Sequence, residues 1–479
     1  MRMTSQPRIL AGPPAGPTQA WQPVGLLVLS LVFYALVGTP TLVALLLLTA
    51  GVTFLTARAL RSSRSATVRV SYAVGIGWSL TVLVVLKMSP VALSPAQVPG
   101  WLRTILLPAS TVGVSYYGLQ TLSYLTDVRR GQIEPEQNPL GLTLSLAFFA
   151  KLLQGPIERC RLLIPQLGKP IRFVYDDARW GLILIAVGLI KKLVVADSLA
   201  PFVNAAFDSP EAYQGLPLII AVYSYSFQIY FDFSGYTDIA LGAARLFGII
   251  LTDNFDRPYW SSSVPVFWSR WHITLSNWLR DYLFMPIVYR LGRRLEPHLP
   301  DYVNDRLCYA IAALGTMSVC GLWHGPRLTF LLWGAVHGIF LVVSNLTRRV
   351  RDRTWRRLPH RWRRLRAALA VVITFNLVTL TWILFRAGGL AEAWDIVANS
   401  SRCFSYGADW SGKALSGSSF GLLGGGLWLA VERRLTRDEL LGRLLRCPVW
   451  FRWAIYYGMV LAVLLFGATR QPTFIYAQF

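Results

Sequence analysis

Charged residues are scarce in this chain. Only 15% of its 479 residues are Asp, Glu, Lys or Arg, whereas 54% are hydrophobic. So few charges cannot cover a water-facing surface, and the apolar residues fall in nearly uncharged blocks such as 26–36 and 42–55. About 20 apolar residues suffice to cross a bilayer, and shorter blocks fit hairpins or re-entrant segments. The composition therefore predicts a polytopic integral membrane protein and excludes a set of soluble domains.

Acidic residues are also few: 24 Asp and Glu stand against 47 Lys and Arg, which gives a net charge of +23. The basic residues crowd into short loops between apolar blocks, chiefly at 58–69, 348–366 and 433–446. Cytoplasmic loops of membrane proteins carry such an excess, which also attracts anionic lipid headgroups. We therefore expect these loops in the cytoplasm, membrane lipids as partners, and no nucleic-acid binding.

The five cysteines show no CxxC spacing, so the sequence predicts neither a zinc site nor a disulfide framework. Cys160 and Cys320 are expected to be small buried hydrophobes rather than nucleophiles. No internal repeat is obvious, which argues against a transporter built of inverted halves. We expect no metal and no bound cofactor.

The pattern of apolar blocks divides the chain into a tail and one membrane domain. Residues 1–23 contain prolines and two arginines but lack the order of a cleaved signal, so we expect a flexible tail. Residues 24–479 are predicted to form one all-α transmembrane domain of about eleven spanning helices with re-entrant or interfacial helices. The candidate segments are 24–37, 40–57, 70–88, 103–125, 140–154, 180–196, 215–231, 306–323, 328–346, 367–385, 418–431 and 452–468.

The middle of the chain, about 227–290, combines aromatic residues with charges that the other segments avoid. Ionisable groups at membrane depth are costly and by default line a cavity or mark a functional path. The charged residues are Asp232, Asp238, Arg245, Asp253, Asp256, Arg257, Arg270, Arg280 and Asp281. Function is expected to concentrate here.

Residues 268–282 have an amphipathic pattern. Trp268, Trp271 and Trp278 fall on one stripe at helical spacing, and polar residues such as Asn277 occupy most of the remaining arc. This pattern predicts one helix that lies at an interface or lines a polar cavity. His272 sits at the edge of the stripe, and the pattern leaves open whether it is catalytic or a hydrogen-bonded structural residue.

A second histidine stands where an apolar segment is interrupted, in Trp323-His324-Gly325-Pro326. Pro326 biases Gly325 away from helical geometry, so His324 is expected at a break where its side chain faces a cavity. Burial favours the neutral imidazole, which can take a proton from a hydroxyl as a general base. His337 has small neighbours that allow close helix packing, and we interpret it as a packed, hydrogen-bonded histidine.

Two carboxylates, Asp232 and Asp238, flank Ser234-Gly235. The Ser-Gly pair predicts a kinked or broken segment. No histidine or third carboxylate stands at ligand spacing, so an ion pair with Arg245 or Arg257, or the orientation of a histidine, is favoured over a metal site.

The ordered set of these motifs resembles the membrane-bound O-acyltransferase (MBOAT) family, in particular the bacterial branch that includes the alginate O-acetyltransferase membrane subunit. The stretches that carry the resemblance are 230–238 (YFDFSGYTD), 253–259 (DNFDRPY), 267–276 (FWSRWHITLS), 278–282 (WLRDY), 323–325 (WHG), 332–334 (LWG) and 337–338 (HG). Weaker matches are 122–128, 154–157, 191–197 and the closing 474–479. The resemblance extends over nearly the whole chain from about residue 24.

The resemblance implies that His324 stands at the family's catalytic position and His272 at its second functional position. It implies a helical bundle around a central tunnel, in which a cytoplasmic acyl thioester, expected to be acetyl-CoA, meets a polysaccharide or cell-wall glycan acceptor. Trp268, Trp271, Asn277, Trp323, Asp232 and Asp238 are the expected substrate-binding residues. The expected setting is the bacterial cytoplasmic membrane, together with an extracytoplasmic or membrane partner protein.

Two stretches depart from the family pattern, Tyr289–Arg294 and Pro326–Leu328. Both are expected near the tunnel mouth, so they leave the acceptor and the partner open. Three alternatives also stay open: D-alanyl transfer toward teichoic acid, a transporter or flippase, and a non-catalytic scaffold.

Overall fold

The structure is a computed structural model that describes residues 21–92, 113–356, 359–402 and 412–467. Within these ranges the chain is all-α, and no residue lies in a strand. Six helices of the described ranges are long and apolar enough to cross a membrane: α2 (Pro40–Ala59), α3 (Ser65–Ala92), α15 (Asp301–His324), α16 (Leu328–Arg356), α17 (His360–Arg386) and α21 (Val449–Phe466). The all-α prediction is confirmed. The larger number of spans and the tunnel stay predictions.

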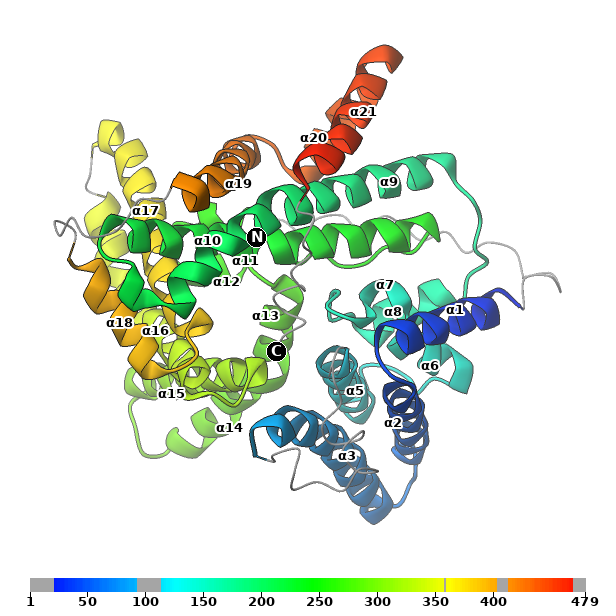
Figure 1. The fold of residues 1–479 in the computed structure, drawn as a ribbon. Coiled ribbons are helices and arrows are strands. Elements are labelled where there is room, and N and C mark those ends of the chain that lie inside the picture. The colour runs from blue at the N-terminus through cyan, green and yellow to red at the C-terminus, as the bar shows by residue number, and fades with distance from the viewer. Residues whose placement is uncertain (1–20, 93–112, 357–358, 403–411, 468–479) are drawn as a thin grey trace.

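The other helices lie between and around these six (Figure 1). The α-helices are α1 (Gln22–Val37), α5 (Val114–Arg129), α6 (Pro139–Ala147), α7 (Phe149–Leu152), α8 (Cys160–Leu167), α9 (Tyr175–Leu189), α10 (Asp197–Asp208), α11 (Leu216–Leu246), α12 (Val264–Trp268), α13 (Ile273–Leu279), α14 (Met285–Leu295), α18 (Leu390–Ser400), α19 (Gly412–Glu432) and α20 (Arg437–Arg446). Two π-helical stretches, η3 (Ile190–Ala196) and η6 (Arg280–Phe284), continue α9 and α13. Residues 1–20 of the expected tail, 103–112 of one expected segment and the closing motif at 474–479 lie outside the described residues.

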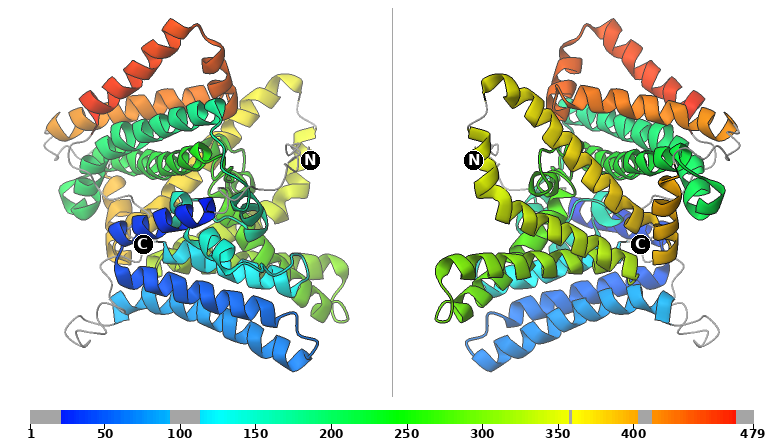
Figure 2. Two further views of the ribbon diagram at one scale, coloured as in Figure 1. Left: turned by 90° about the vertical axis from the view of Figure 1, so that its right-hand side faces the viewer. Right: turned by 90° about the vertical axis from the view of Figure 1, so that its left-hand side faces the viewer.

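The basic connections gather on one side of the bundle. In the left view of Figure 2, the α2–α3 connection and the adjoining ends of α16 and α17 lie on the right, and α19 runs toward that side before it joins α20. The connection α10–α11, with Asp208 and Glu211, lies on the opposite side. Since cytoplasmic loops carry the excess of Lys and Arg, this arrangement is the one that the positive-inside rule requires.

Helices α9 and α11 lie against each other at the middle of the bundle, and glycines allow their backbones to touch. A Cβ at Gly188 would lie 2.5 Å from the carbonyl oxygen of Gly235, and a Cβ at Gly181 would lie 2.6 Å from that of Gly242. Small residues at such positions let membrane helices approach closely. The predicted break at Ser234-Gly235 is therefore wrong: α11 is continuous, and its glycine serves packing.

The predicted single helix over residues 268–282 is also wrong. Helix α12 ends at Trp268, and α13 begins only at Ile273. His272, the residue before α13, has φ 42° and ψ 55°, a left-handed conformation uncommon for a residue with a side chain. Backbone bonds from Asp256 N–H to Arg270 O and from Ile273 N–H to Asn254 O hold the break open. Tertiary contacts thus override the amphipathic period.

Candidate active site

His324 is the last residue of α15, as the Gly325-Pro326 pair predicted. Gly325 is fully extended, with φ 172°, so the helix stops there. The side chain is 3% exposed. Its imidazole centroid lies 4.8 Å from the ring of Trp323, 5.0 Å from Phe385 and 5.4 Å from Trp333. The imidazole is thus packed in an aromatic cluster formed by α15, α16 and α17.

The close approach of α15 and α16 determines where this aromatic cluster lies. A Cβ at Gly321 would lie 2.1 Å from the carbonyl oxygen of Phe330, and a Cβ at Gly334 would lie 2.1 Å from that of Met317. No side chain fits at either position, so the two helices form a tight pair whose turn contains Gly325-Pro326. His324 is therefore carried on a rigid element rather than on a loose loop.

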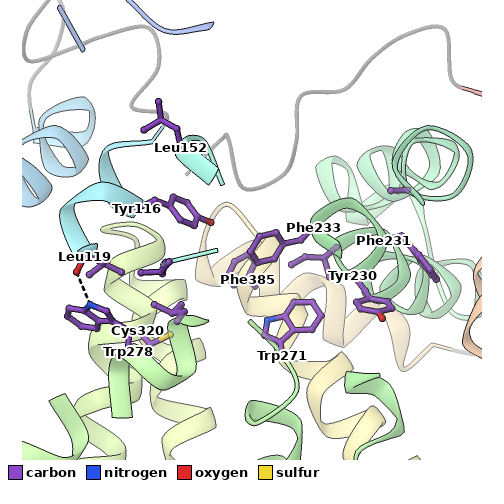
Figure 3. Close-up of a cluster of buried hydrophobic side chains, with 14 of the residues drawn as sticks. Tyr116, Leu119, Leu152, Tyr230, Phe231, Phe233, Trp271, Trp278, Cys320 and Phe385 are labelled. Atoms are coloured by element: carbon purple, nitrogen blue, oxygen red, sulfur yellow. Dashed lines mark hydrogen bonds between the residues drawn. The ribbon is translucent and has the colours of Figure 1, made fainter. Parts of the chain in front are cut away.

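His272 also lies near the Trp323 indole. Its imidazole centroid is 6.2 Å from the ring of Trp323, and it packs edge-on at 4.8 Å against Phe233 and in a stacked geometry at 6.5 Å against Tyr116. Figure 3 shows Tyr116 and Phe233 pointing into the same interior cluster as Phe385 and Trp271. Segments far apart in the sequence therefore bring His272 and His324 to one indole, as expected for a shared site.

Asn254 fixes the orientation of His272. Its Oδ1 lies 3.2 Å from Nδ1 of His272, and it accepts from Thr274 through both the backbone N–H (3.3 Å) and the hydroxyl (2.6 Å). If the carboxamide accepts from Nδ1, then Nε2 is the nitrogen that can act as an acceptor. Sequence reasoning did not single out Asn254, because its partners lie 18 to 20 residues downstream.

Trp268 and Trp271 lie in the aromatic cluster beside the histidines. Trp268 donates from Nε1 to Nδ1 of His337 at 3.2 Å, and Nε2 of His337 lies 3.0 Å from the hydroxyl of Thr381. Both ring nitrogens of His337 are thus engaged, which confirms its interpretation as a packed, hydrogen-bonded histidine. Trp271 is 1% exposed and packs at 5.2 Å against Trp382.

The two carboxylates of α11 form buried ion pairs with lysines of η3. Lys191 Nζ lies 2.7 Å from Asp238, and Lys192 Nζ lies 2.7 Å from Asp232 and 2.8 Å from Asp197. Ion pairing was predicted, but the predicted partners were wrong: Arg245 pairs with Asp177, and Arg257 pairs with Asp256.

The lysine partners were missed, although two adjacent lysines within an otherwise apolar segment are a signal that acidic partners lie nearby. Asn277, the remaining expected residue, is half-buried on α13. No group of three potential metal ligands occurs among the described residues.

The family profile and the individual relatives that match this chain agree on one family. Residues 143–386 match the sequence profile of the MBOAT, membrane-bound O-acyltransferase family. The chain is 37% identical over 308 residues to a probable alginate O-acetylase of Azotobacter vinelandii, a match that covers 64% of this chain and 55% of the relative. It is 34% identical over 312 residues to a peptidoglycan O-acetyltransferase of Helicobacter pylori, covering 60% and 56%.

A more distant relative is a teichoic acid D-alanyltransferase of Bacillus subtilis, 28% identical over 283 residues, with 58% of this chain and 68% of the relative covered. The chain spans little more than half the length of the first two relatives. The range that matches the family profile includes His272, His324 and both carboxylates of α11. This chain belongs to the membrane-bound O-acyltransferase family.

Proposed function

We propose that this protein is an O-acyltransferase of the bacterial cytoplasmic membrane. It transfers an acyl group, acetyl, from cytoplasmic acetyl-CoA to hydroxyls of an extracytoplasmic polysaccharide or cell-wall glycan, directly or through a partner protein. The observation that carries the proposal is the position of His324, at the end of α15 within the bundle and one indole away from His272. The relatives named for O-acetylation of alginate and peptidoglycan support the acceptor class.

In the proposed reaction His324 is the general base. A neutral imidazole accepts the proton of the acceptor hydroxyl as the oxygen forms a bond to the thioester carbonyl carbon. The tetrahedral intermediate then expels the thiolate of CoA, which recovers the proton from the imidazolium. Fixed dipoles in a site of low dielectric stabilise the oxyanion more strongly than water does.

The neighbouring residues have positioning roles in this proposal. His272, held by Asn254, and the indole of Trp323 orient the donor thioester beside His324. Asn277 and the wall formed by Trp268 and Trp271 shape the apolar side of the site. For Asp232 and Asp238, the buried ion pairs favour a role in holding α11 against η3 over direct contact with substrate.

Access to His324 requires movement in this proposal. The imidazole is 3% exposed, and Phe330 and Trp323 are among the rings around it. A thioester and a hydroxyl therefore reach the ring only after an aromatic side chain rotates away. When these side chains close over the site again, they exclude water, which protects the thioester from hydrolysis.

The proposal is tested by measuring transfer of labelled acetyl from acetyl-CoA in membranes. His324→Ala is expected to lower turnover at least about 100-fold, the contribution of a positioned general base, while the protein remains folded. His298→Ala is the matched control, because His298 is exposed at the end of α14. Wild-type turnover in His324→Ala would remove the proposal.

D-alanyl transfer toward teichoic acid is a second candidate, supported by the D-alanyltransferase relative. It uses the same imidazole chemistry on a different thioester, so supplying labelled acetyl and labelled D-alanyl donors side by side separates the two. A transporter or flippase would consume neither donor. A scaffold would tolerate loss of His324 without a change in glycan acetylation in cells.

A further inference from the structure

A surface recess lies between α19 and α20. It has a volume of about 1120 Å³, and its wall includes Trp260, Leu427, Val431, Arg433, Arg434 and Arg443. Small-molecule sites typically have volumes of about 300–1,000 Å³, so the recess is large enough for a cofactor-sized ligand. Apart from Trp260, these residues lie outside the part of the chain that matches the family profile. The recess is thus built largely from this chain's own C-terminal helices.

The wall of the recess carries positive charge from Arg433, Arg434 and Arg443. One turn beyond Arg433 and Arg434, Arg437 pairs with Asp238 and Asp253. By contrast, no ion pair among the described residues engages Arg433 or Arg434. Two adjacent guanidinium groups without a carboxylate partner form a site of positive potential that favours an anion.

Trp260 gives this site a rigid wall. Its Nε1 donates to the carbonyl oxygen of Leu429 at 3.0 Å, which fixes the indole, and the guanidinium of Arg433 lies over the ring at 5.1 Å. A guanidinium held on an aromatic face keeps its donors aligned, so less entropy is lost when it binds a ligand. The aromatic and aliphatic wall beside it suits a ligand with both a flat ring and phosphates.

The recess also adjoins the candidate active site. A smaller cavity of about 60 Å³ shares Val431 and Leu435 with the recess and reaches Asn254. Asn254 is the residue that holds His272. A ligand anchored by Arg433 and Arg434 would therefore lie next to the cavity that reaches Asn254, and α19 ends toward the basic side of the molecule.

We infer that the α19–α20 recess binds the phosphate groups of the CoA moiety of the thioester donor, with Arg433 and Arg434 as the phosphate ligands. Arginine forks match phosphate oxygens bidentately, and the excess of basic residues places this side in the cytoplasm, where CoA thioesters are made. The inference rests on the proposed function for its choice of donor. Anionic lipid headgroups carry the same phosphate chemistry, so the experiment must separate these two sources.

The test measures CoA binding to the full-length protein by titration calorimetry in detergent without anionic lipid. The double variant Arg433→Gln/Arg434→Gln is expected to raise the Kd for CoA at least about 10-fold, the equivalent of about 1.4 kcal/mol. It is also expected to raise the KM for acetyl-CoA more than it lowers kcat. The control is Arg363→Gln/Arg364→Gln, which removes two adjacent exposed arginines of α17 and is expected to change neither value.

The other possible results distinguish the recess inference from the proposed function. If the wild-type protein does not bind CoA, or if the double variant binds CoA as the wild-type protein does, the recess inference is overturned. If the variant loses only its association with vesicles containing anionic phospholipid, the phosphate belongs to lipid and the inference is likewise overturned. If CoA binding depends on both arginines but no acetyl is transferred, the recess stands and the proposed function fails.

Discussion

Lys192 forms a buried ion pair with Asp232, with 2.7 Å between Nζ and Oδ1 and side chains 6% and 1% exposed. The same Nζ lies 2.8 Å from Asp197, so one ammonium group holds two carboxylates on different helices. Taking one partner from a buried ion pair leaves a charge without compensation, which is more costly than the net contribution of the pair. The lysine therefore links η3 to both α10 and α11.

Lys192→Met is expected to destabilise the protein by about 3–5 kcal/mol, because two buried carboxylates lose the ammonium group that they share. Lys191→Met should cost less, since Asp238 keeps Arg437 at 3.5 Å. The stability of both variants is measured by heating the protein in detergent and using size-exclusion chromatography to monitor the folded fraction. An equal or larger loss for Lys191→Met would contradict this description of the network.

The contact of α9 with α11 gives a second prediction. Gly188→Ala would place a Cβ 2.5 Å from the carbonyl oxygen of Gly235, and backbone atoms cannot move aside as a flexible side chain can. Overpacking of this kind costs about 1–3 kcal/mol. The matched control is Gly51→Ala in α2, where a Cβ meets nothing within 4 Å and the change should stabilise by about 0.5–1 kcal/mol. Similar melting temperatures for the two variants would refute the close approach.

Much of the helical framework could be predicted because apolar runs report directly on membrane burial. The segments expected at 40–57, 306–323 and 367–385 lie within α2, α15 and α17, and the break after His324 followed from the geometry of Gly325-Pro326. These features depend on residues within a few positions of one another, which is the range in which sequence periodicity carries information.

The errors have the opposite character. The left-handed conformation of His272 depends on Asn254. The ion pair of Asp232 is made with Lys192, 40 residues upstream. Likewise, Gly235 resembles a helix breaker in isolation but is a packing residue against Gly188. Such long-range contacts override local preference, so they could not be deduced from spacing within one segment.

His337 and His324 should respond differently to substitution. His337→Ala removes the acceptor of the Trp268 indole N–H, and leaving a buried polar group unpaired costs about 1–3 kcal/mol. The hydroxyl of Thr381 keeps its bond to the carbonyl oxygen of Val378. We expect a lower melting temperature but a nearly unchanged turnover per folded molecule. Turnover and the folded fraction are measured on the same purified sample. Loss of turnover in a fully folded His337→Ala protein would show that the wrong histidine has been assigned to catalysis.

The orientation of the bundle can be tested with single cysteines in a background that lacks the native ones. Ser63 lies exposed in the basic α2–α3 connection, whereas Glu211 lies exposed in the α10–α11 connection on the opposite side. The positive-inside rule places the first in the cytoplasm. A membrane-impermeant maleimide is therefore expected to label Glu211→Cys in intact spheroplasts and Ser63→Cys only after permeabilisation. Complete labelling of both in denaturant controls for thiol reactivity, and the reverse pattern would move the α19–α20 recess away from the compartment that contains CoA.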